Sequence, residues 1–512
     1  MCAGHRHHWW NGRVRIVAKF TPCRRRMLLW SPILLVALGS IPLRLHDPNP
    51  DVSWLITMCE RIVNGEIAYV DIFETTPPVP MLLYMPAVAI ARLTGVTAEA
   101  ATFAIAYACA FAVLVLSARI LPDSLGDGGA SRSLVLLPAS FFFFLLPNDV
   151  FAQREYFATA FALPMVSVFV RHARENAWPP LTDRALAAVL AGLTIAIKPP
   201  LFALPGIFVA GYYWWRTRSL SFVTSSGLLA AGIIGLVFTA ASLAAFPQYL
   251  GDITTLVREI YVPVRSHTLA LLNDNAFLGV LSCLGLSLIL CAWRKPPVAE
   301  MLALMAATGF LVAYLIQGKF FPYHAIPAAL FGTIAATIAV RQRLRIIRTN
   351  AASWTLAAGV YVLAFGGIAA LFLSAFGQGR PAMSNLSWAD GLDRPTALAV
   401  SPDIATAFPL ARRINAVWVD RIHSQWVARY TRYALQSGNL TEAETEKFRR
   451  YYDQDLRWIL RQIADKKPEI IIQDVTPGHV WLSTELESLQ PGHLDGYDRI
   501  AEEVGIRILR RR

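Results

Sequence analysis

Five carboxylates follow the first long apolar run of this chain within a few tens of residues. The run "MLLWSPILLVALGSIPL" (27–43) is succeeded by "NPDVSWLITMCERIVNGEIAYVDIFETTPP" (49–78). The acidic residues of the second stretch are Asp51, Glu60, Glu66, Asp71 and Glu74. A charge at the centre of a bilayer costs about 2.5–3.5 kcal/mol, whereas at its edge the cost is lower. A carboxylate held there can take a proton from an attacking hydroxyl, so this loop is a candidate for acid–base chemistry at one membrane face.

The composition is that of a polytopic α-helical membrane protein. Of the 512 residues, 55% are hydrophobic and 16% are charged, against about 25% charged in soluble domains. The net charge of +12 could indicate nucleic acid, but the basic residues cluster where apolar runs end, which is typical of cytoplasmic loops. These clusters are Arg24–Arg26, Arg216 with Arg218, Arg294 with Lys295, and residues 341–348. We therefore expect no nucleic-acid partner.

The basic loops also predict how the chain crosses the membrane. They all face the cytoplasm if residues 79–95, interrupted by Pro80 and Pro86, form a juxtamembrane helix that does not cross. The basic segment 1–26 is then cytoplasmic and precedes an uncleaved anchor, and the tail 377–512 lies outside. The eleven predicted spans are 27–43, 98–120, 132–147, 155–171, 184–198, 200–215, 222–246, 275–293, 299–316, 322–340 and 352–376.

The tail, residues 377–512, is predicted to be a small extracytoplasmic α/β domain. Two β-rich runs, 396–401 and 468–475, flank helical patterns, and this alternation favours a parallel sheet. Asp403 is a candidate helix N-cap. We expect the tryptophans of "RINAVWVDRIHSQWVARY" to form the domain's own core and "RILRRR" to be a solvated end. The six cysteines form no CxxC pair, so neither a disulfide framework nor a metal cluster is expected.

Other segments bring polar residues to the same outer face as the first loop, 44–78. They are "PNDVFAQREY" (147–156), the amphipathic segment 246–275 and "QGKFFPYH" (317–324). The candidate site residues in the first and third are Asp149, Arg154, Glu155, Lys319, Tyr323 and His324, and Lys198 ends a span in "AIKPPLF".

The first loop resembles that of the GT-C superfamily of membrane glycosyltransferases, in the branch with protein O-mannosyltransferases and lipid A aminoarabinose transferases. The resemblance consists of Asp51 shortly after the first span, the turn "NGEIAYVD" (64–71), Glu74, and Pro77-Pro78 opening a juxtamembrane helix. "AIKPPLF" and "GKFFPYH" also fit a bacterial branch. Two departures stand out: Pro50 replaces a common histidine, and "TTPP" replaces the usual basic or Asn residue before the prolines.

The resemblance implies a GT-C-like domain over 27–376 that transfers one sugar from a polyprenyl-phosphate carrier to an acceptor hydroxyl. The reaction would occur at the periplasmic side of a bacterial inner membrane, with inversion, and the acceptor would be a glycan, a glycolipid or a protein. Asp51 would be the base, while Glu74 and Asp149 would position hydroxyls. Phosphate binding falls to Arg154, Lys198 and Lys319, and further substrate contacts to Tyr69, Asp71, Glu155, Tyr323 and His324. No cofactor is expected, although clustered acids can hold a divalent metal ion.

Each candidate residue also has a structural interpretation. Asp51 could cap the helix that follows it, Arg154 could pair with Glu155 or Asp149, and Lys198 could snorkel from a span end. Lys319 and His324 could belong to an aromatic belt at the interface.

Two other functions fit a many-spanning chain: a lipid or sugar transporter or flippase, and a scaffolding protein. A transporter usually places its ionisable residues near the bilayer midplane. Here they gather at one face, which favours the enzyme.

Overall fold

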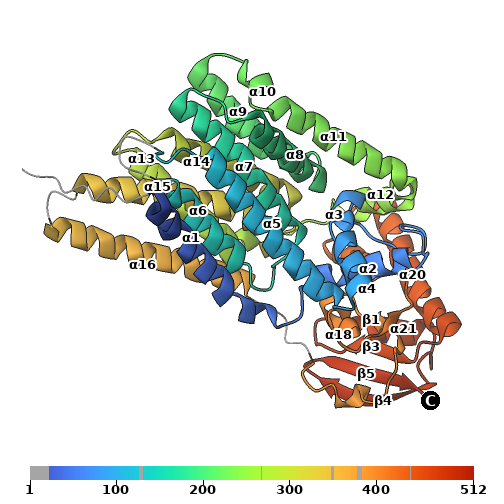
Figure 1. Ribbon diagram of the computed structural model, residues 1–512. Helices are drawn as coiled ribbons and strands as arrows, with labels where there is room; N and C mark the ends of the chain where they lie inside the picture. Colours follow the sequence, from blue (N-terminus) through green and yellow to red (C-terminus); the bar gives the residue numbers. More distant parts are fainter. Residues whose placement is uncertain (1–21, 126–130, 267, 348–350, 378–382, 439) are drawn as a thin grey trace, which may run out of the picture.

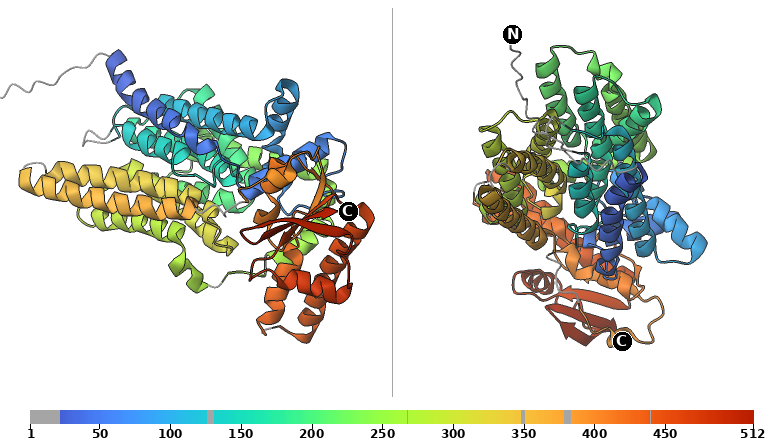
Figure 2. Two further views of the ribbon diagram at one scale, coloured as in Figure 1. Left: turned by 90° about the horizontal axis from the view of Figure 1, so that it is seen from below. Right: turned by 60° about the vertical axis from the view of Figure 1, so that its left-hand side comes forward.

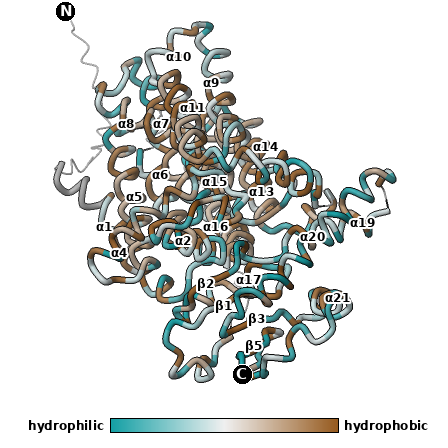
Figure 3. The backbone as a smooth tube through the Cα atoms, turned by 90° about the vertical axis from the view of Figure 1, so that its right-hand side faces the viewer, coloured by the Kyte–Doolittle hydropathy of each residue, from teal (hydrophilic) through white to brown (hydrophobic). Residues whose placement is uncertain are grey.

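The computed structural model describes residues 22–125, 131–266, 268–347, 351–377, 383–438 and 440–512. It consists of a long helical bundle with a smaller α/β domain, the tail, at one end of it (Figures 1 and 2). Hydrophobic residues follow the bundle helices, whereas hydrophilic residues are more frequent in the tail (Figure 3). Of the predicted cytoplasmic segment 1–26, residues 1–21 lie outside the described part.

Each of the eleven predicted spans coincides with a helix. Among the described residues, α5, α7, α11, α14, α15 with the turn before it, and α16 are long and apolar enough to cross a membrane. The remaining helices do not meet these criteria over the described residues, so a multi-pass membrane protein is supported while the number eleven stays a prediction. The helices are α1 (Pro22–Gly39), α5 (Ala98–Ile120), α6 (Ser133–Phe144), α7 (Arg154–Glu175), α8 (Leu181–Ile197), α9 (Leu204–Thr217), α11 (Leu228–Ala245), α13 (Asn275–Cys291), α14 (Val298–Gln317), α15 (Ile326–Ile347) and α16 (Ala351–Phe376).

Small residues bring neighbouring bundle helices together. At Gly192 of α8, an added Cβ would lie 2.6 Å from Cγ2 of Ile234, and at Gly235 of α11 it would lie 2.9 Å from Cβ of Ile195. Close approach at glycine is typical of membrane helices, which lack a hydrophobic force between them. Helices α7 and α15 are mostly buried in the bundle, whereas α11 and α16 leave most of their apolar surface uncovered, as lipid-facing helices do.

The segment between α1 and α5, which includes the first loop, folds into helices at the tail end of the bundle (Figure 1). It contains α2 (Pro50–Val63), α3 (Pro78–Leu82) and α4 (Met85–Thr94), so the predicted helix 79–95 is present but interrupted near Tyr84. The N-cap of α2 is Asn49, whose side chain accepts from the Asp51 backbone N–H at 3.0 Å. The interpretation of Asp51 as the cap is therefore wrong, because Asp51 lies one residue inside the helix.

Short elements connect the helices of the bundle. Between α9 and α13 lie α10 (Phe222–Ser225), η3 (Pro247–Leu250), α12 (Asp252–Leu256), a π-helical turn η4 (Val257–Tyr261) and η5 (Thr268–Asn273). The remaining turns are η1 (Ile41–Arg44), η2 (Leu201–Ala203), η6 (Pro322–Ala325) and η7 (Ser387–Ala389).

The tail contains a five-stranded sheet of order β2-β1-β3-β5-β4. Its strands are β1 (Thr396–Val400), β2 (Val417–Trp418), β3 (Ile470–Asp474), β4 (Tyr497–Glu503) and β5 (Ile506–Arg511). Its helices are α17 (Ile404–Ala407), α18 (Leu410–Arg413), α19 (Trp426–Gln436), α20 (Glu442–Lys466) and α21 (Trp481–Leu489). The predicted N-cap is confirmed, since Oδ1 of Asp403 accepts from the Ala405 N–H at 2.9 Å.

The predicted parallel pairing is confirmed for the two predicted strands, since β1 pairs parallel with β3. β2 is also parallel to β1, whereas β5 pairs antiparallel with both β3 and β4, so the whole sheet is mixed. The segment "RILRRR" is not a solvated end, because it forms β5 and buries Ile508 and Leu509. A two-residue turn, Val504-Gly505, joins β4 to β5 with positive φ at both positions, as tight hairpins require.

The tail shares its hydrophobic core with the first external loop. The ring of Trp54 in α2 lies 5.4 Å from Phe408 and 6.5 Å from Trp418, centroid to centroid. The prediction that the tail tryptophans form the domain's own core is confirmed for Trp418, whose ring lies 4.9 Å from that of Phe408, and Trp54 of α2 extends this core beyond the tail. The backbone adds to this contact, since the Phe73 N–H donates to the carbonyl of Arg421 at 2.7 Å. The tail is thus packed onto the loop that carries Asp51.

Candidate active site

A cavity of about 320 Å³ lies where the first loop, the bundle and the tail meet. The first loop contributes Asp51, Trp54 and Glu74, the bundle contributes Arg154 and Tyr323, and the tail contributes a third wall. The complete lining is Asn49, Pro50, Asp51, Trp54, Leu55, Glu74, Thr75, Thr76, Arg154, Tyr261, Phe321, Tyr323, Pro402, Asp403, Ile404, His423, Ser424, Trp426, Arg429 and Tyr430.

Asp51 is held in place by the residue that precedes α7. Nε2 of Gln153 donates to Oδ2 of Asp51 at 3.1 Å and to Oδ1 of Asn49 at 2.5 Å. Gln153 is fully buried, so its amide has a fixed orientation. The first turn of α2 and this amide together present the Asp51 carboxylate to the cavity, where it could act as a base.

Glu74 lies in the same cavity but is more tightly bound. Its Oε2 accepts from Nε1 of Trp54 at 2.5 Å, and its Oε1 accepts from the Thr76 N–H at 2.6 Å. Tyr69 does not line the cavity; it is buried with a positive φ, and its hydroxyl donates to the Thr76 carbonyl at 2.9 Å. Tyr69 therefore shapes the turn that presents Glu74.

Arg154 brings a cation to the cavity. It opens α7, donates through Nη1 to the Thr76 hydroxyl, and lies with its guanidinium 6.0 Å from the centroid of the Tyr323 ring. Its Nε is 3.6 Å from Oε1 of Glu155. This Nε is buried, and the nearby carboxylate compensates for the loss of water around it.

Glu155, Lys198 and His324 form a cluster beside Arg154, outside the cavity wall. Nζ of Lys198 donates at 2.5 Å both to Oε1 of Glu155 and to Oε1 of Gln317, and Nε2 of His324 lies 3.5 Å from the same carboxylate oxygen. Arg154 does pair with Glu155, as the structural interpretation has it, yet it still faces the cavity. Lys198 is bound within this cluster and does not face the cavity.

Lys319 also lies outside the cavity and holds one of its walls. Its ammonium donates to the carbonyls of Tyr261 and Val264, and it lies 4.2 Å and 4.6 Å from the ring centroids of Tyr261 and Tyr430. Burial lowers the pKa of Lys319 to about 8. It connects the π-helical turn to α19, and both tyrosines line the cavity.

The structure does not bring Asp71 or Asp149 into the cavity with Asp51. Asp71 is exposed, and its Oδ2 accepts from the Ile67 N–H at 2.8 Å, which closes a local turn. The Asp149 N–H donates to the carbonyl of Phe376 at 2.9 Å, which holds this residue at the end of α16. Burial raises the pKa of Asp149, and the positive charges that act on it are those of Arg44 and His46. Hydroxyl positioning by Asp149 is thus unsupported by the geometry.

Sequence reasoning missed the tail residues of the cavity. Trp426, Arg429 and Tyr430 are spaced i, i+3 and i+4, which places them on one face of α19, and this spacing was the available signal. Nη1 of Arg429 pairs with Oδ2 of Asp403 at 3.0 Å. His423 is also missed; burial lowers its pKa, so it is neutral near pH 7.

Among the residues that the structure describes, no group of three or more His, Cys, Asp or Glu side chains could hold a metal ion. Independence from metal stays a prediction.

The crystal structure of ArnT, an aminoarabinose transferase of the GT-C family, from Cupriavidus metallidurans in the apo state superposes on the chain with a TM-score of 0.58. The match covers 95% of this chain and 98% of that one at 13% sequence identity. The resemblance to the GT-C superfamily is thereby confirmed for the fold. No family model and no curated protein matches the sequence.

Proposed function

We propose that this chain is a membrane glycosyltransferase that transfers one sugar from a polyprenyl-phosphate carrier to an acceptor hydroxyl. The main supporting observation is that Asp51 and Glu74 of the first loop line one cavity of about 320 Å³ together with Arg154 of α7. The fold shared with ArnT supports a GT-C transferase as the class. The acceptor is a glycan, a glycolipid or a protein.

The residues of the cavity suit a single displacement. Asp51 takes the proton of the acceptor hydroxyl, and the oxygen attacks the anomeric carbon of the sugar. The bond between that carbon and the phosphate oxygen breaks, and the polyprenyl phosphate leaves with the electron pair. Arg154 stabilises the charge that develops on this phosphate. One displacement inverts the anomeric configuration.

Glu74 has a different part in this proposal. Both of its carboxylate oxygens already accept hydrogen bonds, from Trp54 and Thr76. A carboxylate fixed in this way is better suited to positioning a sugar hydroxyl than to accepting a proton. Arg429, which enters the cavity from the tail, is a second cation for the phosphate. Lys198 and Lys319 support the walls instead of binding phosphate.

The distribution of basic residues supports an orientation with the N-terminus in the cytoplasm and the tail in the periplasm of a bacterial inner membrane. In this orientation the cavity opens on the periplasmic side, where polyprenyl-phosphate sugars are consumed by external transferases.

The test is a comparison of cell-envelope glycolipids and glycans by mass spectrometry with and without the gene. Loss of a species heavier by one sugar unit, restored by the wild type but not by Asp51→Asn, is the expected result. The matched control is Asp71→Asn, an aspartate of the same loop outside the cavity. Full restoration by Asp51→Asn would refute the proposal, and movement of the carrier lipid by that variant would favour a flippase.

A further inference from the structure

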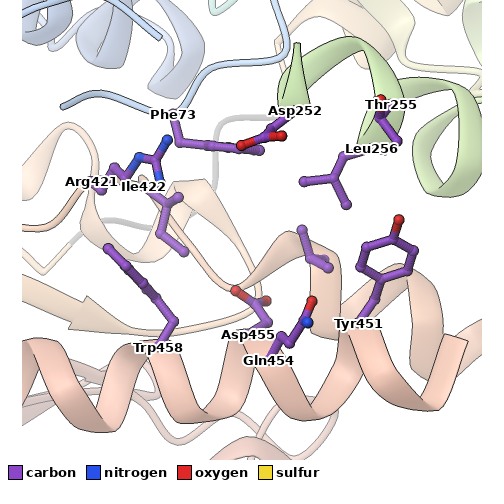
Figure 4. A pocket seen from close by; sticks show the side chains of 11 residues that line it. Phe73, Asp252, Thr255, Leu256, Arg421, Ile422, Tyr451, Gln454, Asp455 and Trp458 are labelled. Carbon is purple, nitrogen blue, oxygen red and sulfur yellow. The ribbon is translucent and has the colours of Figure 1, made fainter. Parts of the chain in front are cut away.

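A second cavity of about 330 Å³ lies outside the active site, between the first loop, α12 and helix α20 of the tail (Figure 4). Aromatic and aliphatic side chains form one part of its lining, among them Phe73, Leu256 and Trp458. Polar side chains form the other part, and Asp252, Gln454 and Asp455 belong to it. The proposed mechanism uses none of these residues.

Arg421 stands in this cavity between two aromatic rings. Its guanidinium carbon lies 5.2 Å from the centroid of Phe73 and 5.7 Å from that of Trp458. Among the described residues, its side chain makes no ion pair within 4.0 Å, and its buried Nε has no hydrogen-bond partner. The buried Nε therefore has a donor to offer to a ligand.

The carboxyl group of Asp455 can likewise form further hydrogen bonds. Asp455 is 8% exposed, and Oδ2 accepts from the Ala428 N–H at 2.8 Å. This is the single hydrogen bond of its carboxyl group among the described residues. Figure 4 shows Asp455 and Gln454 on α20 facing the same space as Arg421 and Asp252.

The charges of the lining select against ionic ligands. A phosphate or carboxylate near Arg421 would meet Asp252, whereas a cation near Asp252 would meet Arg421. Like charges brought together at an interface disfavour the wrong partner. A neutral ligand with many hydroxyls avoids both conflicts, because carboxylates accept from hydroxyls and guanidinium and amide groups donate to them.

The apolar part of the lining narrows the ligand class further. Trp458 and Phe73 offer flat rings, and a sugar ring has an apolar face of C–H groups beside its rim of hydroxyls. Pockets that combine an apolar wall with a few placed polar groups are typical of small-molecule sites. A neutral sugar thus matches both halves of the cavity.

The second cavity and the active site share a wall. Arg421, Ile422 and Val427 line the second cavity, while His423, Ser424 and Trp426 line the active site, so one segment of the tail serves both. The rings of Phe73 and Trp426 lie 6.4 Å apart, centroid to centroid, across this wall. A ligand in the second cavity therefore contacts the segment that shapes the active site.

We propose that the second cavity binds a neutral sugar residue of the acceptor, which makes the acceptor a glycan or glycolipid with more than one sugar. The assignment of this sugar to the acceptor rests on the proposed function, whereas the binding of a neutral sugar does not.

Binding is tested by saturation-transfer NMR on the full-length protein in detergent, with methyl glycosides of common neutral hexoses as probes. At least one hexoside should bind, and Gln454→Leu and Trp458→Leu should each weaken it at least tenfold. Asp465→Asn, an exposed aspartate of α20 outside the cavity, should leave binding unchanged. Gln454 is exposed, so its variant is expected to fold even if Trp458→Leu does not.

The outcomes separate the two proposals. The sugar site is refuted if no hexoside binds, or if binding survives Gln454→Leu. Binding of inorganic phosphate in place of the sugars refutes the argument from the charges of the lining. Asp51→Asn protein should bind the hexoside like the wild type, even though transfer is lost. In a transfer assay with glycolipid extract from the deletion strain, Gln454→Leu should raise KM for the extract and leave KM for the donor unchanged. A change in donor KM alone would count against an acceptor site.

Discussion

Arg412 joins the tail to the first external loop, and its removal tests how strongly the two are docked. Its Nη1 and Nη2 donate to the carboxylate of Glu60 at 2.8 and 2.9 Å, and Nη1 also donates to the Thr57 hydroxyl at 2.9 Å. Nε pairs with Glu99. The side chain of Arg412 is 13% exposed, whereas those of Glu60 and Glu99 are 36% and 23% exposed.

The expected cost of Arg412→Met follows from these exposures. Removing one partner of a fully buried ion pair costs about 3–5 kcal/mol. Both carboxylates reach water and can be rehydrated, so we expect about 2–3 kcal/mol, lost from docking of the tail. At 1.36 kcal/mol per factor of ten, the ratio of undocked to docked tail should rise roughly 30- to 160-fold.

Limited proteolysis of the full-length protein in detergent measures this ratio, because cleavage tracks the open population when closing is fast. The rate at which the tail is released should rise by the same factor for Arg412→Met and stay unchanged for Arg449→Met, an exposed arginine of α20. The double variant with Glu60→Gln should cost less than the sum of the single variants, since the two side chains interact. A release rate within threefold of wild type, or additive costs, would refute the reasoning.

Four further changes test the active site and the second cavity. Gln153→Ala should lower kcat about 10- to 100-fold with donor KM unchanged, since Asp51 loses the amide that orients it. A rise in donor KM by the same factor would contradict this. Arg154→Lys should lower kcat about 100-fold in the same assay, because it loses the planar donor fork at the phosphate. Asp149→Asn should stay within about threefold of wild type, and a larger loss would return Asp149 to the site. Burial raises the pKa of Asp455 from 3.8 to about 7, so its protonated form stabilises the fold fully below about pH 4 and this contribution is lost as the pH rises to 7. The fall in Tm between pH 4 and 7 should therefore be smaller for Asp455→Asn than for the wild type. An equal fall in the two proteins would contradict the raised pKa of Asp455.

The sequence predicted the bundle well because hydrophobic runs report directly on membrane helices. It also contained the signal for the cap of α2, since Pro50 at the first helical position makes Asn49 the natural cap. The antiparallel strand β5 could not be recognised, because "RILRRR" shows one short alternation and acquires its meaning only by pairing with Ile470–Asp474. Strand pairing across such separations depends on the fold.

The candidate site was likewise predictable where its residues lie in a local sequence pattern. Asp51 and Glu74 lie in one loop with a recognisable pattern, and Arg154 starts a span at the same face. Asp403 and Arg429 lie about 350 residues beyond Asp51, and no local pattern connects the two regions. Lys198 and Lys319 carry the expected charge, but whether a lysine faces a cavity or holds a wall is decided by its neighbours in three dimensions.

The core that Trp54 shares with Phe408 and Trp418 has a consequence for how the protein is made. Trp54 is synthesised more than 350 residues before Phe408 and Trp418, so α2 cannot reach its final environment until this part of the tail has been made. The cavity can thus be completed only after the tail has been synthesised as far as Tyr430, its last lining residue. Exchange of the tail between related proteins would likewise require a matching exchange in α2.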